Sequence, residues 1–495
     1  MTDPQSSVRG LRGTLTTQKI VLLVVAAAAP LSAVVGTVPL AFSIGTGPGV
    51  PGMFVFAGLV LLCFSVGYAA MSRNVVNAGG FYTYISLGLG RVTALSGGLV
   101  AVVSYCAMSI GLAAAFGYFA QMVGAAVGLN LPWEVWAGVA VGAVALLGYR
   151  QIDLSARVLW TLMVVELGVL AVLDIGVIAH KGAQALPLTS MAPSTVFSGA
   201  AGVAMMFAFM SFIGFESAAL YGEETRDPRR TVPVATYASV LVIAVFYALS
   251  SWVAVGAAGP DAIRQTATKE LGNLFFTLST TYVSDLLTTV MQVFLVTSVF
   301  ASMLALHNAA NRYIYALGRE RVLPGWVGHV HERHHSPHRA SIAQTVASVL
   351  VLAAFGVAGL DPYTTLATST LGLGTLGIVA LQACAAVAVV SYFWRRKDGH
   401  WWRTLLAPGL GAIGLAVSVV LLVTNFRLLV GTDNAIVNGL PFVLAIAALV
   451  GVGYGLWLRA KRPERYAGIA VGQIREESVP EPPVAELQLS GAEES

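Results

Sequence analysis

Charged residues are scarce in this chain of 495 residues. Asp, Glu, Lys and Arg together make up 11% of the chain, whereas soluble globular proteins carry roughly 25%. The apolar set AVILMFWYC makes up 57%, and the mean hydropathy is +0.77. This composition excludes a soluble enzyme. The formal net charge of +4 is small, so the charge gives no indication of a nucleic-acid partner.

Cysteines are few and nucleotide-binding signatures are absent. Cys63, Cys106 and Cys384 each lie inside an apolar run, which predicts neither a disulfide framework nor a zinc site. The sequence has no G-x-x-x-x-G-K-[S/T] loop and no sizeable soluble stretch, so we do not expect pumping driven by ATP within this chain. We expect no cofactor, and no nucleophile–base pair points to an enzyme.

Long apolar runs dominate what is present. The first run, 20–44, is longer than the apolar core of a signal peptide, which is about 7–15 residues, and we interpret it as a retained membrane span. Because lipid excludes irregular backbone, helices are expected. The sequence predicts an all-α polytopic membrane protein with twelve transmembrane helices, at about 20–44, 52–72, 92–125, 132–149, 156–180, 195–222, 232–258, 284–316, 341–360, 363–394, 404–425 and 438–458.

Lysine and arginine divide unevenly between the two sides of this map. With the N-terminus taken as cytoplasmic, 24 of the 28 basic residues fall on the cytoplasmic side. The positive-inside bias then places both termini in the cytoplasm. We predict a cytoplasmic segment at 1–19 and, from its prolines and acidic residues, a disordered acidic cytoplasmic tail at 463–495. The basic residues on the other side are Lys181, Arg264, Lys269 and Arg427.

Two spans contain residues that a helix tolerates poorly. Pro30, Gly36 and Pro39 interrupt the first, and Ser211–Gly214 lies in the middle of the sixth, just before Glu216. Paired discontinuities of this kind are typical of transporters built from inverted repeats, with the substrate between the broken helices. Broken helices leave N–H groups free at one end and C=O groups free at the other, which suits a ligand with both a carboxylate and an ammonium group. For each glycine taken alone, close helix packing is the alternative interpretation.

Four segments of the sequence form recognisable motifs: Ser211–Ser217 with its Gly-Phe-Glu sequence, the loop Glu223–Pro233 that follows it, Ala78–Tyr84 with Gly88–Gly90, and Asn311–Pro324. In combination these motifs resemble those of the amino acid–polyamine–organocation permeases, and they are specific for the family but not for a substrate. They are in register with the predicted spans from about residue 20 to residue 460, so the resemblance extends over nearly the whole of that range.

The resemblance implies two inverted five-helix repeats, at 20–180 and 195–394, with broken helices 1 and 6, followed by two helices at 404–458. By alignment the first break falls at Val34–Thr37, where members often carry Gly-Ser-Gly and only Gly36 is retained here. Substrate is then expected between the broken helices, against side chains of spans three and eight. The substrate-binding residues that the resemblance implies are Gly36, Thr37, Tyr105, Ser109, Met210, Ser211, Ile213, Gly214, Ser302 and Leu306; ordinary helix packing is the alternative for each.

Two acidic residues inside spans are candidates for ion coupling. A carboxylate there costs about 2.5–3.5 kcal/mol on insertion scales unless it is protonated, paired or facing water. Glu166 lies where many members of the family carry a lysine whose ammonium group takes the place of a sodium ion. Between the two functional interpretations we favour a proton as the coupling ion over a cation site joined by Ser298 or Ser302. A neutral acid that is hydrogen-bonded to a neighbouring helix is the alternative without a role in coupling. Glu216 is alternatively a structural acceptor that caps the broken helix.

Histidine is concentrated in one loop. Five of the eight histidines crowd a basic stretch between spans eight and nine. We interpret the stretch as a solvated cytoplasmic loop and expect no metal, because there is no cysteine and no buried scaffold to close a site. The five are His329, His331, His334, His335 and His338.

The sequence favours a secondary active transporter in the cell membrane, which moves amino acids or related amines by alternating access, with proton symport preferred. An exchanger and a polyamine or ethanolamine permease are alternatives of the same class. A channel or a membrane receptor is the rival class, and saturable uptake with counterflow in liposomes separates the two.

The uneven distribution of basic residues predicts the orientation of the chain. Reporter fusions after Ser495 and within the loop 329–338 are both expected to report cytoplasm, because most basic residues stay on that side. Alkaline phosphatase and green fluorescent protein fusions at both positions measure this. An external signal from either position contradicts the map of twelve spans.

Overall fold

A computed structural model of the chain describes helices and turns, with no β-strand in the described part. Motif residues Ala78, Gly79, Glu223 and Glu224 lie outside this part, as do most of the predicted N-terminal segment and most of the tail. The described residues are 16–75, 80–150, 156–218, 227–331, 336–397 and 399–470.

Ten helical stretches of the described chain are long and apolar enough to cross a membrane, so the protein is an all-α, multi-pass membrane protein. Nine of the ten overlap with one of the long helices given below, and the tenth contains the shorter α9 (Ala201–Phe212). The long helices are α3 (Val50–Asn74), α5 (Arg91–Ala126), α7 (Ala156–Lys181), α10 (Pro228–Ala258), α13 (Asp285–Arg319), α14 (His338–Val357), α15 (Thr368–Arg396), α16 (Ala407–Thr424) and α19 (Pro441–Lys461).

The predicted spans 20–44 and 132–149 are not among the ten stretches. The first corresponds to two short helices, α1 (Thr17–Ala27) and α2 (Pro30–Ile44). The second corresponds to α6 (Trp133–Arg150), which has Glu134 in its first turn and Arg150 in its last. Ten of the twelve spans are therefore found, and the count of twelve stays a prediction.

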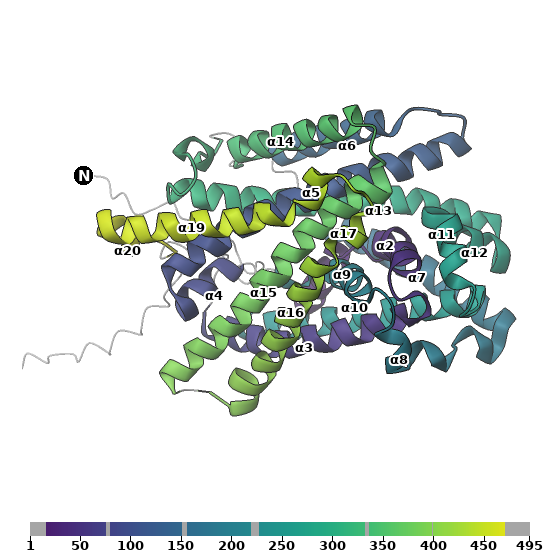
Figure 1. The fold of residues 1–495 in the computed structure, drawn as a ribbon, viewed down its shortest axis with the longest axis horizontal. Helices are drawn as coiled ribbons and strands as arrows, with labels where there is room; N and C mark the ends of the chain where they lie inside the picture. Colours follow the sequence, from purple (N-terminus) through teal and green to yellow (C-terminus); the bar gives the residue numbers. More distant parts are fainter. Residues whose placement is uncertain are drawn as a thin grey trace, which may run out of the picture.

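Several of the short helices lie at the two ends of the bundle. Figure 1 shows α4 (Gly80–Leu89) and α20 (Pro463–Ala467) at one end, and α8 (Pro193–Val196), α11 (Ile263–Glu270) and α12 (Leu274–Tyr282) at the opposite end. In the same view α2 and α9 lie in the middle of the molecule. The interrupted helices are therefore surrounded by the long ones.

Contacts between helices follow the relation expected of two repeats. We count α1 and α2 together as span one and α9 as span six. Helices that lie five spans apart then pack on each other: α3 on α10, α5 on α13, and α6 on α14. α2 also packs on α9. A two-fold relation between two five-helix units brings equivalent elements together in this way. The inverted repeats stay a prediction that these contacts support.

Glycines allow α15 to approach α5 closely. A Cβ added at Gly374 would lie 2.2 Å from Met108 Cγ, and one at Gly377 would lie 1.9 Å from Ser104 Oγ. Small residues at helix contacts are how membrane helices pack, because lipid provides no hydrophobic drive between them. The α5–α15 contact is therefore a tight and fixed part of the bundle.

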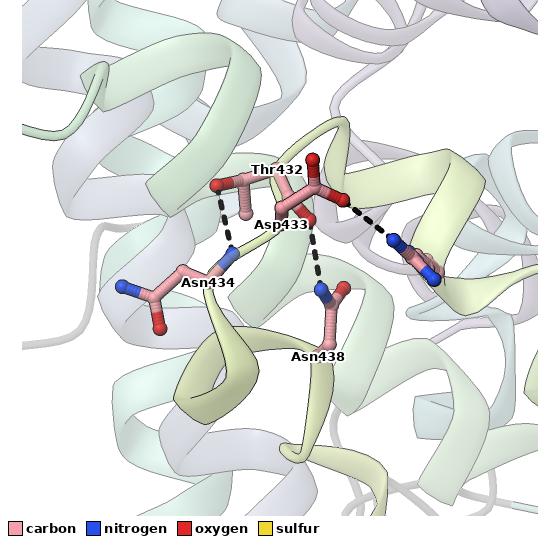
Figure 2. Close-up of polar contacts among 5 residues, drawn as sticks. Thr432, Asp433, Asn434 and Asn438 are labelled. Carbon is pink, nitrogen blue, oxygen red and sulfur yellow. Dashed lines mark hydrogen bonds and ion pairs between the residues drawn. The ribbon is translucent and has the colours of Figure 1, made fainter.

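The connection from α16 to α19 contains α17 (Phe426–Val430) and α18 (Ala435–Asn438) and is held by its own polar groups. Figure 2 shows Thr432, which accepts a hydrogen bond from the Asn434 N–H at 3.3 Å through its hydroxyl and one from Asn438 Nδ2 at 2.8 Å through its carbonyl. Asp433 pairs with Arg427 at 2.6 Å. Both of these side chains are largely exposed, so the pair contributes at most about 1 kcal/mol.

The start of the predicted disordered tail is folded. α20 covers Pro463–Ala467, and Ile469 and Ala470 are buried. The Ala470 N–H donates to Glu320 at 3.1 Å, and burial raises the pKa of that carboxyl group. The expectation of disorder therefore does not hold for 463–470, because two apolar residues and a backbone donor find partners there, and 471–495 lies outside the described residues.

Candidate functional site

The first interruption lies between α1 and α2, at Ala28 and Ala29. Ala29 adopts a left-handed conformation, with φ 43° and ψ 75°, which costs a residue other than glycine about 1–2 kcal/mol. Pro30 explains the position of the break, because proline has no N–H to donate and keeps the preceding residue out of the helical conformation. The Tyr247 hydroxyl donates to the Ala28 carbonyl at 3.2 Å and so satisfies one group that the break exposes.

The predicted break at Val34–Thr37 is wrong. Gly36 and Thr37 lie inside α2, one to two turns after its start. The physical reason is the difference between the two residue types: a glycine inside a helix costs only about 1 kcal/mol, whereas proline fits a helix best in its first turn. Of the three interruptions named from the sequence, Pro30 is the one that matters.

The break predicted in span six is confirmed. α9 ends at Phe212, Ile213 is extended, and Gly214 has φ 118°, a conformation that only glycine adopts readily. The Gly214 N–H donates to Glu216 Oε2 at 2.9 Å, and the Ser217 N–H donates to the Gly214 carbonyl at 3.0 Å. The backbone freed by this break is therefore bonded within the same short segment.

A cavity lies between the two interrupted helices. It contains about 720 Å³ of atom-free space, a volume that includes solvent at its opening. Its walls come from α2, α5, α9, α13 and α15. They are mainly apolar, with Met108, Leu112, Phe119, Phe207, Val299 and Leu371. The hydroxyl groups that line it belong to Ser32, Thr37, Ser211, Ser302, Tyr363 and Thr368.

No Asp, Glu, Lys or Arg of the described chain lines this cavity. Thr37 and Ser211 face each other across the two interrupted helices, with their hydroxyl oxygens 2.9 Å apart. Each hydroxyl also lies within hydrogen-bond distance of a carbonyl of its own helix, Ala33 for Thr37 and Phe207 for Ser211. Because each hydroxyl has one proton, one of the two donates to the other, which in turn donates to its own helix carbonyl. A ligand here would therefore meet hydroxyls, helix ends and apolar side chains.

Seven of the ten predicted substrate-binding residues line the cavity, and three do not. Tyr105 points to the span-six break, where its hydroxyl donates to Glu216 Oε1 at 3.1 Å and its ring stacks on Tyr313. Ser109 is buried away from the cavity, and Gly214 lies behind it in the break. The seven that line it are Gly36, Thr37, Met210, Ser211, Ile213, Ser302 and Leu306.

Several lining residues were missed from the sequence. Met108, Leu112, Ala115 and Phe119 follow each other at steps of four, three and four residues on α5. This is one face of a helix, so the predicted face of span three could have been extended along it. Tyr363 had no comparable signal: it lies in η7 (Pro362–Ala367), a π-helical turn before α15, and its hydroxyl donates to the Gly36 carbonyl at 2.9 Å.

Glu216 is enclosed by the span-six break. Its carboxylate accepts hydrogen bonds from the Gly214 N–H and the Tyr105 hydroxyl, and its own carbonyl accepts one from the Tyr68 hydroxyl at 3.2 Å. The side chain is 4% exposed and does not line the cavity. These bonds are what a structural acceptor that caps a broken helix needs, and they favour that role over ion coupling.

Glu166 joins three helices beside the first break. Its Oε2 atom accepts hydrogen bonds from the Leu31 N–H of α2 at 3.2 Å and from the Ser298 hydroxyl of α13 at 2.9 Å, while Glu166 itself belongs to α7. The residue is 4% exposed. A carboxylate at the N-terminus of a helix is stabilised by the unpaired N–H groups and by the helix dipole. Glu166 therefore supplies the cap that α2 lacks in its own sequence.

The histidine-rich loop is only partly described. His329, His331 and His338 are in the described part, and His334 and His335 lie outside it. Within the described ranges, no group of three or more His, Cys, Asp or Glu side chains is arranged to hold a metal ion.

The sequence matches a family described as amino acid permease over residues 15–452, a range that contains both interrupted helices and the cavity. The chain is 25% identical to the branched-chain amino acid permease BcaP of Bacillus subtilis, over 76% of this chain and 80% of that protein. It is 26% identical to the BcaP of Lactococcus lactis, over 58% of this chain and 64% of that one. It is 23% identical to the low-affinity putrescine importer PlaP of Escherichia coli, over 83% and 88%.

Proposed function

We propose, because this chain belongs to the amino acid permease family, that it carries amino acids across the cell membrane by alternating access, with the substrate held between α2 and α9. The chain is a multi-pass membrane transporter for amino acids or amines, and not an enzyme. Both termini are proposed to lie in the cytoplasm, from the bias in basic residues.

The observation that carries this proposal is the cavity at the two helix breaks. Ala28, Ser32 and Ala33 line it beside the start of α2, and Ser211 and Ile213 line it beside the end of α9. A helix N-terminus favours a carboxylate and a helix C-terminus favours an ammonium group. The two groups of an amino acid therefore find opposite partial charges in one cavity.

The walls of the cavity suggest which side chain the substrate carries. They provide apolar contacts from α5, α13 and α15, and no carboxylate or basic group among the described residues. A charged substrate side chain that moved from water into this cavity would find no oppositely charged partner, and burying an unpaired charge is costly. We infer a preference for aliphatic amino acids, in keeping with the two relatives named as branched-chain amino acid permeases. A diamine such as putrescine would lack an acidic partner for its second ammonium group.

Glu166 is the residue that we propose for proton coupling. Its bonds to Leu31 and Ser298 connect the first break to α7 and α13, so a change in its protonation acts on the helix that forms the substrate cavity. A buried carboxyl group that loses and regains a proton needs no ion cage. A cation site is less suited to this geometry, because one of the two groups that face Glu166 Oε2, the Leu31 N–H, is a donor and cannot be a cation ligand. Exchange of one substrate for another remains the alternative of the same class.

The proposed site predicts the effect of filling two glycines. Gly36→Val should abolish binding, because the added side chain enters the cavity and overpacking costs about 1–3 kcal/mol. Gly214→Val should do the same, because φ 118° is strained for valine. Binding to purified protein measures this, with surface expression as the check on folding. Gly36→Ala is the matched control: its Cβ would lie an ordinary 3.6 Å from Phe119, so binding should persist. Unchanged affinity in either valine variant moves the site elsewhere.

The apolar walls predict substrate selectivity. Leucine, isoleucine and valine should raise the thermal stability of the purified chain, by about 2.7 kcal/mol at a hundred times the dissociation constant. Lysine, glutamate and putrescine should leave it unchanged. A thermal-shift screen over the amino acids and common amines measures this. Stabilisation by lysine or putrescine, but not by leucine, contradicts the inferred preference.

Proton coupling through Glu166 predicts the driving force of uptake. Leucine uptake into proteoliposomes should rise with an inward proton gradient, be indifferent to sodium, and lose its dependence on the gradient in Glu166→Gln. The glutamine keeps the size of the side chain but cannot exchange a proton. Saturation and counterflow in the same assay separate a transporter from a channel. Uptake that requires sodium, or a Glu166→Gln variant with an unaltered pH profile, removes Glu166 from the mechanism.

A further inference from the structure

The N-terminus of α2 already holds a carboxylate, and it is the protein's own. Pro30 has no N–H, the Leu31 N–H donates to Glu166, and the Ala33 N–H donates to the Ala29 carbonyl at 3.0 Å. The remaining backbone donor of this first turn is the Ser32 N–H, since the Ser32 hydroxyl donates to the Ala29 carbonyl at 3.0 Å. The positive end of the interrupted helix, which would otherwise be free for a ligand carboxylate, is therefore shared with Glu166.

The substrate cavity reaches the same helix end. Ser32 and Ala33 line it, and so does Ser302, which is one helical turn beyond Ser298 on α13. Ser302 is 5% exposed and has no hydrogen-bond partner among the described residues. Ser298 thus binds the internal carboxylate, and the next hydroxyl on the same helix face is unpaired and directed to the cavity.

We propose that the carboxylate of a substrate and the carboxylate of Glu166 compete for the N-terminus of α2, so that a carboxylated substrate binds together with one proton. This rests on the proposed function. Two carboxylates that share one site cannot both stay ionised, and the pair holds a proton between them. The proton comes from solvent and forms an O–H bond on the pair, while the substrate is otherwise unchanged. An amine without a carboxylate leaves Glu166 in place and takes up no proton.

Few other titratable groups face Glu166. α2 has none, and the one titratable residue of α1 is Lys19, which is exposed. α10 contributes Tyr247, which interacts electrostatically with Glu166. α13 contributes the Ser298 hydroxyl, and the nearest titratable residues on that helix are Asp285 and His307. α12 contributes Tyr282, whose hydroxyl donates to the Ala257 carbonyl, and η2 (Gly182–Ala185) contributes none.

The test compares L-leucine with 3-methylbutylamine, the amine that lacks its carboxylate, on the purified full chain. Titration calorimetry in buffers of different ionisation enthalpy counts the protons taken up on binding. We expect one proton per leucine and none per amine. Leucine affinity should fall by up to about tenfold per pH unit as the pH rises above the titration range of the pair, because binding takes up a proton, while amine affinity stays level.

Two variants make the test specific. Glu166→Gln should bind leucine without proton uptake and without pH dependence, because the amide does not titrate. Asp174→Asn is the matched control: Asp174 is the other buried carboxylate of α7, eight residues away and bonded to Ser250 at 2.7 Å, and its loss should leave the pH dependence of leucine binding intact.

Four results overturn the inference. Three of them contradict this inference but leave the proposed function intact: equal proton uptake for leucine and its amine, pH dependence that persists in Glu166→Gln, and pH dependence that disappears in Asp174→Asn. Binding of neither compound contradicts the proposed substrate class and this inference together.

Discussion

A membrane helix that is interrupted must find partners for its freed N–H and C=O groups inside the protein, because lipid offers none. This chain meets that constraint with one buried glutamate at each break. Glu166 reaches from α7 to the Leu31 N–H at the start of α2, and Glu216 turns back to the Gly214 N–H at the end of α9. The two acids that the sequence singled out are thus both bonded to broken backbone.

The two glutamates differ in what surrounds them, and this separates their roles. Glu216 is bonded within its own segment and to Tyr105, behind the cavity wall. Glu166 is bonded to two other helices, at the helix end that the cavity reaches. A change of charge on Glu216 would act on the span-six break and on Tyr105 of α5, whereas a change on Glu166 acts on the relation between α2, α7 and α13. Coupling is therefore better placed on Glu166.

The sequence predicted the parts of this structure that single residues or long patterns determine. Apolar runs located ten spans, and Gly214 located the second break, because its position needs a positive φ. The first break was assigned to Gly36, although Pro30 is the residue that removes a donor. Ala29 gave no signal, because an alanine in a left-handed conformation is imposed by tertiary packing. Tyr363 reaches the cavity through a π-helical turn whose register no periodicity reveals.

The contacts of α2 beyond its first turn indicate which part of the bundle moves in the alternating access that we propose. Arg264 of α11 donates to the carbonyls of Ser43 and Gly45 at 3.1 and 3.0 Å, and Tyr363 donates to Gly36. Each such bond contributes about 0.5–3 kcal/mol, and they lie at partly exposed positions. The α5–α15 contact, in contrast, is fixed by glycines with no room for a side chain. A substrate can only shift an equilibrium by its difference in affinity between two states. A difference in binding free energy of a few kcal/mol is enough to exchange the polar contacts that hold α2. It is too little to separate α5 from α15. α2 is therefore the element on which substrate and proton can act.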